Sequence, residues 1–110
     1  MTQKPYLSLV IPLFNEEEVL PKLLKELYSV CNSLNRGYEI IFVDDGSYDR
    51  TPLLLKESAG KSSNIKFIRF SRNFGHQAAF NAGVDFASGD VVITMDGDLQ
   101  AYSLGLDTAI

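Results

Sequence analysis

Two carboxylates and a carboxamide follow an apolar run near the end of this 110-residue chain. Asp96 and Asp98 are two residues apart, and Gln100 comes two residues later. The preceding run, Val91 to Met95, predicts a buried strand whose end presents both aspartates to the same point. Carboxylate and amide oxygens are the ligands that Mg2+ and Mn2+ prefer. The segment therefore predicts a divalent metal site formed by Asp96, Asp98 and Gln100, although a pair of aspartates at this spacing also arises by chance.

The composition is that of one acidic globular domain. The chain is 45% hydrophobic and 22% charged, with a net charge of −4 and a pI of about 4.8. It has no cluster of Lys and Arg, so we expect no nucleic-acid partner. An acidic protein that binds an anionic ligand needs help from a metal or from helix N-termini. Cys31 is the only cysteine. It lies on an apolar helical stripe, which predicts a small core residue in a reducing compartment.

Membrane targeting is not expected from these residues. Residues 1–4 are polar, and the apolar run that follows is interrupted by Pro12, which is not the pattern of a signal peptide. No stretch reaches the roughly 20 apolar residues that a membrane-spanning helix requires. We therefore expect a cytoplasmic location.

Apolar runs alternate with segments of helical periodicity along the chain. The predicted strands are Leu7–Ile11, Tyr38–Val43, Ile65–Phe70 and Asp90–Met95. Three helices are expected between these strands. Asn15 and Thr51 are expected to cap the first two, which have Pro21 and Pro52 in their first turns. The third is expected to span about His76 to Ala87, with Gly89 in a left-handed conformation after it. The order β-α-β-α-β-α-β predicts a parallel α/β sheet.

Each predicted strand is followed by a polar cluster. The clusters are Pro12 to Glu17, Asp44 to Ser47, Ser71 to Gly75 and Asp96 to Gln100. Because the carboxyl ends of parallel strands meet at one edge of a sheet, we expect these clusters to form one ligand site. The chain lacks the glycine-rich loops that bind phosphates in dinucleotide and P-loop proteins. A metal at Asp96 and Asp98 is then the expected means of holding a diphosphate.

Individual residues of the clusters have predicted roles. Asp44 is expected to accept hydrogen bonds from a base or ribose, and Phe14 offers an apolar face to a base. Arg72 contacts either a phosphate or only solvent. Asp45 is equally well explained as a turn residue. His76, which has no partner nucleophile in the sequence, is expected to cap or pack a helix.

Two other protein classes with acidic strand ends fit less well. A phosphohydrolase of the D-x-D-x-T type has its aspartates after the first strand, whereas Asp96 and Asp98 follow the fourth. A receiver domain has its acidic pair after the first strand and a lone phosphoacceptor aspartate after the third, and Ser71-Arg72-Asn73 supplies none. A non-catalytic remnant that only binds nucleotide stays open.

Taken in order, the clusters resemble those of family 2 glycosyltransferases of the GT-A fold. The matching segments are Leu9–Glu17, Ile41–Thr51, Ser71–Ala79, Ala82-Gly83 and Gly89–Gln100. The segments Arg72–Ala79 and Met95–Gln100 are similar to those of the polyprenyl-phosphate branch of that family. The resemblance covers residues 7–100 and depends on the order and spacing of all the segments.

The resemblance implies a UDP- or GDP-sugar donor, Mg2+ or Mn2+, a polyprenyl-phosphate acceptor and inversion at the anomeric carbon. A family 2 enzyme with a different acceptor is the alternative. The positions that match donor nucleoside contacts are Pro12, Phe14, Asn15, Glu16 and Asp44, with Asp45 in the same pocket. Asp96, Asp98 and Gln100 match the metal and diphosphate motif. No catalytic base is identified, since the acceptor phosphate is already anionic.

The last ten residues depart from the family pattern. We therefore divide the chain into a nucleotide-sugar-binding part, residues 1–100, and a divergent tail, residues 101–110. These 110 residues are expected to fold partially, to bind nucleotide weakly and to transfer no sugar. Apolar surface on the incomplete sheet predicts self-association. A full-length relative is expected at the cytoplasmic face of a membrane.

Overall fold

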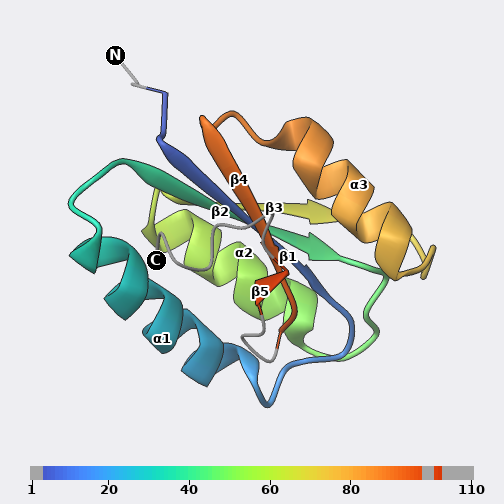
Figure 1. Cartoon of the computed structure of the whole chain (residues 1–110). Helices are drawn as coiled ribbons and strands as arrows, with labels where there is room; N and C mark the ends of the chain where they lie inside the picture. The colour runs from blue at the N-terminus through green and yellow to red at the C-terminus, as the bar shows by residue number, and fades with distance from the viewer. Residues whose placement is uncertain (1–3, 98–100, 103–110) are drawn as a thin grey trace.

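The chain forms a five-stranded sheet with helices on both faces (Figure 1). The computed structural model describes residues 4–97 and 101–102. The elements are β1 (Leu7–Leu13), α1 (Leu20–Ser33), β2 (Tyr38–Asp44), α2 (Thr51–Lys61), β3 (Ile65–Arg69), α3 (His76–Phe86), β4 (Val91–Met95) and β5 (Ala101–Tyr102). The sheet order is β3-β2-β1-β4-β5, in which β1 to β4 are parallel and β5 pairs antiparallel with β4. The predicted parallel α/β architecture is confirmed.

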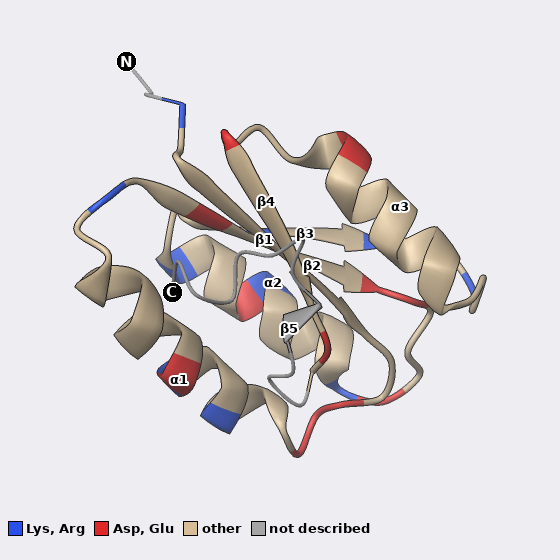
Figure 2. Ribbon diagram, viewed as in Figure 1, with Lys and Arg blue, Asp and Glu red and all other residues tan. Residues whose placement is uncertain are grey.

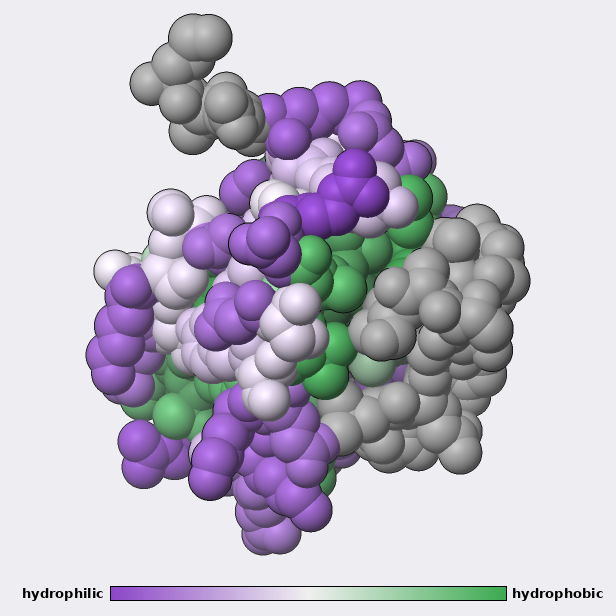
Figure 3. Space-filling model, turned by 60° about the vertical axis from the view of Figure 1, so that its left-hand side comes forward, coloured by the Kyte–Doolittle hydropathy of each residue, from purple (hydrophilic) through white to green (hydrophobic). Residues whose placement is uncertain are grey.

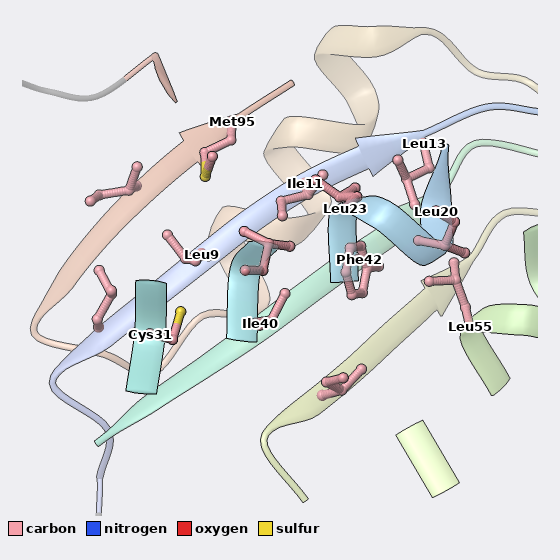
Figure 4. Close-up of a cluster of buried hydrophobic side chains, with 14 residues drawn as sticks. Leu9, Ile11, Leu13, Leu20, Leu23, Cys31, Ile40, Phe42, Leu55 and Met95 are labelled. Carbon is pink, nitrogen blue, oxygen red and sulfur yellow. The ribbon is translucent and has the colours of Figure 1, made fainter. Parts of the chain in front are cut away.

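The sheet separates two apolar layers. One face packs against α1 and α2, and its core includes Leu9, Phe42 and Leu55 (Figure 4). The other face packs against α3, with Val10 and Ala79 among its buried residues. Because successive residues of a strand point to opposite faces, strands covered on both sides are buried on both faces and mostly apolar, as β1 and β2 are.

The apolar stripe of α1 supplies much of the larger core layer. Leu20, Leu23, Leu27 and Cys31 are its buried residues. Cys31 is 1% exposed, and burial raises the pKa of its thiol to about 11. The predicted role of Cys31 as a small core residue is confirmed.

Strand β1 continues through Pro12 to Leu13, beyond its predicted end. The Leu13 carbonyl accepts a hydrogen bond from the Asp45 N–H. The backbone N–H and C=O groups of the odd-numbered β1 residues therefore point towards β2, and those of the even-numbered residues point towards β4. Pairing with β4 ends at Val10. Pro12 therefore lies beyond the last hydrogen-bonded pair between β1 and β4, so the N–H that proline lacks is not needed by the sheet.

The caps expected for the first two helices are wrong. Helix α1 begins at Leu20, with Val19 as a cap that makes no side-chain hydrogen bond. Thr51 is itself the first residue of α2 and also makes no cap. Local sequence suggested caps because Asn and Thr suit such positions, but both side chains bond between loops instead. Pro21 and Pro52 do lie in first turns, as predicted.

Gly89 has a packing role and does not end α3 in a left-handed conformation. Helix α3 ends at Phe86, and its cap, Ala87, is extended. A Cβ atom built on Gly89 would lie 2.6 Å from the Ser8 Oγ and 2.8 Å from the Ser8 backbone nitrogen. The glycine is required because the chain entering β4 passes directly against β1.

A buried carboxylate joins three strands at the end of the sheet opposite the polar clusters. Glu39 in β2 is 2% exposed. It accepts hydrogen bonds from Ser8 Oγ at 2.6 Å, Lys66 Nζ at 2.6 Å and the Ser88 N–H at 2.8 Å. Burial alone raises the pKa of Glu39, but these hydrogen bonds outweigh it and hold the pKa at about 2. Its charged form is thus part of the folded structure.

We expect Glu39 to make the fold acid-sensitive. Its folded pKa of about 2 is below the ordinary 4.5, so its stabilisation is present above pH 4.5 and lost as the pH falls towards 2. Between pH 7 and pH 3 this corresponds to about 2 kcal/mol of unfolding free energy. Urea unfolding at both pH values is the measurement. A Glu39→Gln variant should lose this part of the pH dependence, whereas Glu57→Gln, at an exposed position of α2, should keep it. Equal pH dependence in all three proteins would contradict the assignment.

Candidate functional site

A cleft of about 280 Å³ opens at the carboxyl ends of β1, β2 and β4. Its walls are formed by Pro12, Leu13, Phe14, Glu16, Asp45, His76, Asp96 and Gly97. Acidic segments follow all three strands at this end of the sheet (Figure 2). The predicted convergence of strand-end clusters is therefore observed for three of the four clusters. The segment after β3 contributes through the start of α3, at His76.

The loop after β1 is held by the loop after β2. Three successive backbone N–H groups, those of residues 15, 16 and 17, donate to side chains of the second loop. The acceptors are Ser47 Oγ at 2.8 Å, Thr51 Oγ1 at 2.9 Å and Asp49 Oδ2 at 3.2 Å. These side chains stabilise the loop after β1, because they accept hydrogen bonds from its backbone N–H groups. Phe14 and Glu16 are thereby placed in the cleft.

Asn15 completes the connection in the reverse direction. Its Oδ1 accepts a hydrogen bond from the Tyr48 N–H at 3.0 Å, and its backbone is left-handed, with φ of +53°. Asparagine tolerates this conformation better than most residues. Asn15 thus shapes the loop and is not among the described residues that form the cleft wall.

The two adjacent aspartates at the end of β2 differ in position. Asp44 is fully buried, and its Oδ2 accepts a 3.3 Å hydrogen bond from the Ser47 N–H. Burial raises the pKa of Asp44, and Oδ1 has no hydrogen-bond partner among the described residues. Asp45, in contrast, lines the cleft. The structure therefore brings Asp45, rather than the more strongly predicted Asp44, to the candidate site.

Asp45 also holds the start of α3. Its two carboxylate oxygens accept hydrogen bonds from the Phe74 N–H at 2.8 Å and the Gly75 N–H at 3.2 Å. Carboxylates are favoured beside a helix N-terminus, where the backbone donors and the helix dipole attract negative charge. One side chain thus lines the cleft and fixes the element that carries His76.

Gly46 brings the loops after β2 and β3 into backbone contact. It has φ of +80°, and a Cβ atom there would lie 2.2 Å from the carbonyl carbon of Arg72. Arg72 itself is exposed, with its guanidinium 4.6 Å from the centre of the Phe74 ring. Its side chain does not form part of the described cleft wall.

Asp96 and His76 meet across the cleft. The distance between His76 Nε2 and Asp96 Oδ1 is 3.1 Å, a hydrogen bond between α3 and the segment after β4. Next to Asp96, a Cβ atom on Gly97 would come within 3.2 Å of Glu16 Oε2. The first aspartate of the predicted metal motif therefore contacts His76, and its neighbour Gly97 lies close to Glu16.

The donor set fits a hard divalent cation in its chemistry. Asp96 faces a cleft that is also lined by the carboxylates of Glu16 and Asp45. Asp98 and Gln100 lie outside the described residues. Within the described part of the chain, no three His, Cys, Asp or Glu side chains are close enough together to hold a metal ion. The predicted ligand set thus stays a prediction, in which Asp96 is the member whose position is described.

Sequence reasoning found most of the cleft wall but missed two features. Pro12, Phe14, Glu16, Asp45 and Asp96 are brought together, whereas Asn15, Asp44 and Arg72 are not. The contribution of His76 was missed because its partner, Asp96, is twenty residues away in the sequence. The loop connection was also missed, because the acceptors Ser47, Asp49 and Thr51 are more than thirty residues from the N–H groups they bind.

Comparisons with known proteins identify the family. The family model described as glycosyl transferase family 2 matches residues 8–103. An undecaprenyl-phosphate 4-deoxy-4-formamido-L-arabinose transferase of Pseudomonas fluorescens is 47% identical over 88% of this chain and 30% of its own length. An uncharacterised glycosyltransferase of Bacillus subtilis is 43% identical over 84% of this chain and 29% of its own length. The chain therefore spans about 30% of the length of these curated relatives.

Solved structures share the fold. A mannosyltransferase from Pyrobaculum calidifontis, in complex with GDP-Man and Mn2+, has a TM-score of 0.72 at 22% identity, over 88% of this chain and 28% of its own. The Staphylococcus aureus protein TarS, residues 1–349 in complex with UDP-GlcNAc, has a TM-score of 0.70 at 26% identity, over 84% of this chain and 26% of its own. These likenesses confirm the predicted GT-A fold. Since the family model matches nearly the whole chain, this protein belongs to glycosyl transferase family 2.

Proposed function

We propose that this chain forms the donor side of a glycosyltransferase that moves a sugar from a UDP- or GDP-sugar to a polyprenyl phosphate with inversion. The observation that carries the proposal is the cleft in which Phe14, Glu16, Asp45 and Asp96 come together at the strand ends. The names of curated relatives that act on undecaprenyl phosphate support the acceptor class.

Charge is the reason for a metal in this cleft. Three carboxylates line it, and a nucleoside diphosphate would bring further negative charge close to them. Like charges at such distances repel strongly in a partly desolvated site. We propose that Asp96, Asp98 and Gln100 hold Mg2+ or Mn2+, which when bound neutralises the diphosphate and assists its departure. The Mn2+ in the Pyrobaculum mannosyltransferase complex supports a divalent ion at such a fold.

The nucleoside is proposed to bind at the end of β1. Phe14 is 38% exposed and forms an edge-to-face contact with Tyr48, with the ring centres 5.9 Å apart. An exposed aromatic face beside carboxylate acceptors suits a base and a ribose, because the ring stacks on the base and the carboxylates accept hydrogen bonds from the ribose hydroxyls. Pro12 closes this part of the cleft.

Nucleotide titration calorimetry on the 110-residue chain tests the proposal. UDP, GDP and ADP are titrated with Mn2+, with Mg2+ and with EDTA. We expect metal-dependent binding of UDP or GDP and no detectable sugar transfer to a polyprenyl phosphate by these residues alone. Binding that is equal in EDTA would refute the metal role. Absence of binding to both UDP and GDP would refute the donor site.

We expect a Phe14→Ala variant to bind the same nucleotide about tenfold more weakly, because the loss of one stacking contact costs about 1–3 kcal/mol. Phe86→Ala is the matched control, since Phe86 is also exposed, at 53%, but lies at the end of α3. The measurement is the nucleotide dissociation constant in Mn2+. Equal weakening in both variants would show that Phe14 does not stack on the base.

Other expectations remain predictions. No helix in the described part of the chain is long and apolar enough to cross a membrane. We further propose a cytoplasmic location and, for a full-length relative, the cytoplasmic face of a membrane. Apolar residues are visible between hydrophilic ones on the surface (Figure 3), and the predicted self-association would use such surface.

A further inference from the structure

The side chain of His76 has a role that the family assignment does not supply. We propose that His76 is a positioning residue, whose Nε2–H holds the Asp96 carboxylate in the orientation that receives the metal. This inference rests on the proposed metal-dependent donor site. It adds a residue of α3 to a motif located after β4.

The hydrogen bond has one chemically consistent direction. An ionised carboxylate only accepts hydrogen bonds, so the 3.1 Å contact with Asp96 Oδ1 requires the proton to be on His76 Nε2. The Asp96 carboxylate is then oriented by a donor of fixed position. In metal sites, groups that orient the direct ligands influence affinity in this way.

The imidazole is itself held in place by two contacts of α3. Its ring meets Phe80, one helical turn later, edge to face with the centres 4.6 Å apart. The start of the helix is fixed by Asp45 through the Phe74 and Gly75 N–H groups. A continuous chain of contacts thus runs from Asp45 at the end of β2, through the first turn of α3, to Asp96 after β4. The ends of β2 and β4 are thereby set relative to one another.

The contact is not explained by stability alone. The His76 side chain is 61% exposed and that of Asp96 is 24% exposed, and polar contacts at the surface contribute little to folding, about 0–1 kcal/mol. Its location in the cleft wall, against the first aspartate of the metal motif, places its effect at the site. Removal of the N–H should therefore change metal affinity with little change in the free energy of unfolding.

Two substitutions separate the N–H from the ring. His76→Phe keeps the ring against Phe80 and removes the donor, whereas His76→Gln retains an amide N–H near the place of Nε2. The control is Gln77→Ala, since Gln77 bonds to Asn81 on the exposed side of the same helix. Binding of Mn2+ alone is measured by the loss of the free-ion electron paramagnetic resonance signal. We expect His76→Phe to weaken binding about tenfold, His76→Gln to stay within about threefold, and Gln77→Ala to match the parent.

A metal-free measurement distinguishes failure of this inference from failure of the proposed function. At pH 8, the 13C resonance of the Asp96 carboxyl carbon should move in His76→Phe and remain in place in His76→Gln. Absence of Mn2+ binding by the parent, with this carbon response intact, would refute the metal site and leave the orienting contact standing. An unchanged carbon resonance in His76→Phe, or equal Mn2+ affinity in His76→Phe and the parent, would overturn the inference. Equal losses in His76→Phe and His76→Gln would also overturn it.

Discussion

An Asp96→Asn variant is expected to bind Mn2+ about 100-fold more weakly and to lose metal-dependent nucleotide binding. The estimate follows because even groups that only orient metal ligands change affinity by about 10- to 100-fold, and Asp96 is a proposed direct ligand. Asparagine keeps the oxygen that accepts from His76 Nε2 at 3.1 Å, so the substitution removes charge while preserving the hydrogen bond. Calorimetric titration with Mn2+, with and without UDP or GDP, is the measurement.

Asp85→Asn provides the matched control for Asp96→Asn. Asp85 is exposed on α3, and the substitution makes the same change in net charge. We expect this variant to bind Mn2+ and nucleotide as the parent does. If Asp96→Asn retained parental Mn2+ affinity, the metal would have to be held elsewhere in the chain.

A Gly46→Ala variant is expected to lose about 4 kcal/mol of unfolding free energy. The left-handed backbone, with φ of +80°, costs a non-glycine residue about 1–3 kcal/mol. The added Cβ would lie 2.2 Å from the Arg72 carbonyl carbon and 2.4 Å from the Asn73 nitrogen. Overpacking of this kind costs about 1–3 kcal/mol more, and backbone atoms cannot move aside as a flexible side chain can.

Gly60→Ala is the control for Gly46→Ala. Gly60 lies in α2, and a Cβ atom there would meet nothing within 4 Å. Alanine favours helix over glycine, so this variant should gain about 0.5–1 kcal/mol. Urea unfolding measures both changes. A loss below about 1 kcal/mol in Gly46→Ala would show that the loops after β2 and β3 separate at little cost.

The order of elements was readable from local patterns. Runs such as Ile40 to Val43 are apolar on both faces, which only a covered parallel strand requires. The regular alternation of strands and helices then determines that the polar clusters share one edge. The cleft wall formed by Phe14, Glu16, Asp45 and Asp96 follows from that rule.

The uses of individual polar side chains were less predictable. Asn15 and Thr51 have the residue types of helix caps, yet they bond across loops more than thirty residues apart in sequence. Asp44 and Asp45 are chemically identical neighbours and both are buried, but only Asp45 lines the cleft. Gly89 serves close packing against Ser8 in place of a helix end. In each case, the deciding partner is distant in the sequence.

By itself, the sequence of this family 2 glycosyltransferase chain determined the α/β order, the shared edge and the oxygen-rich character of the site, because periodicity and residue chemistry are local properties. Only the tertiary structure decided that Asp45 rather than Asp44 lines the cleft and that His76 reaches Asp96. It also decided that Ser47, Asp49 and Thr51 hold the loop that carries Phe14. Such pairings depend on the relative placement of strand ends, which packing of the two apolar layers sets and no local pattern encodes.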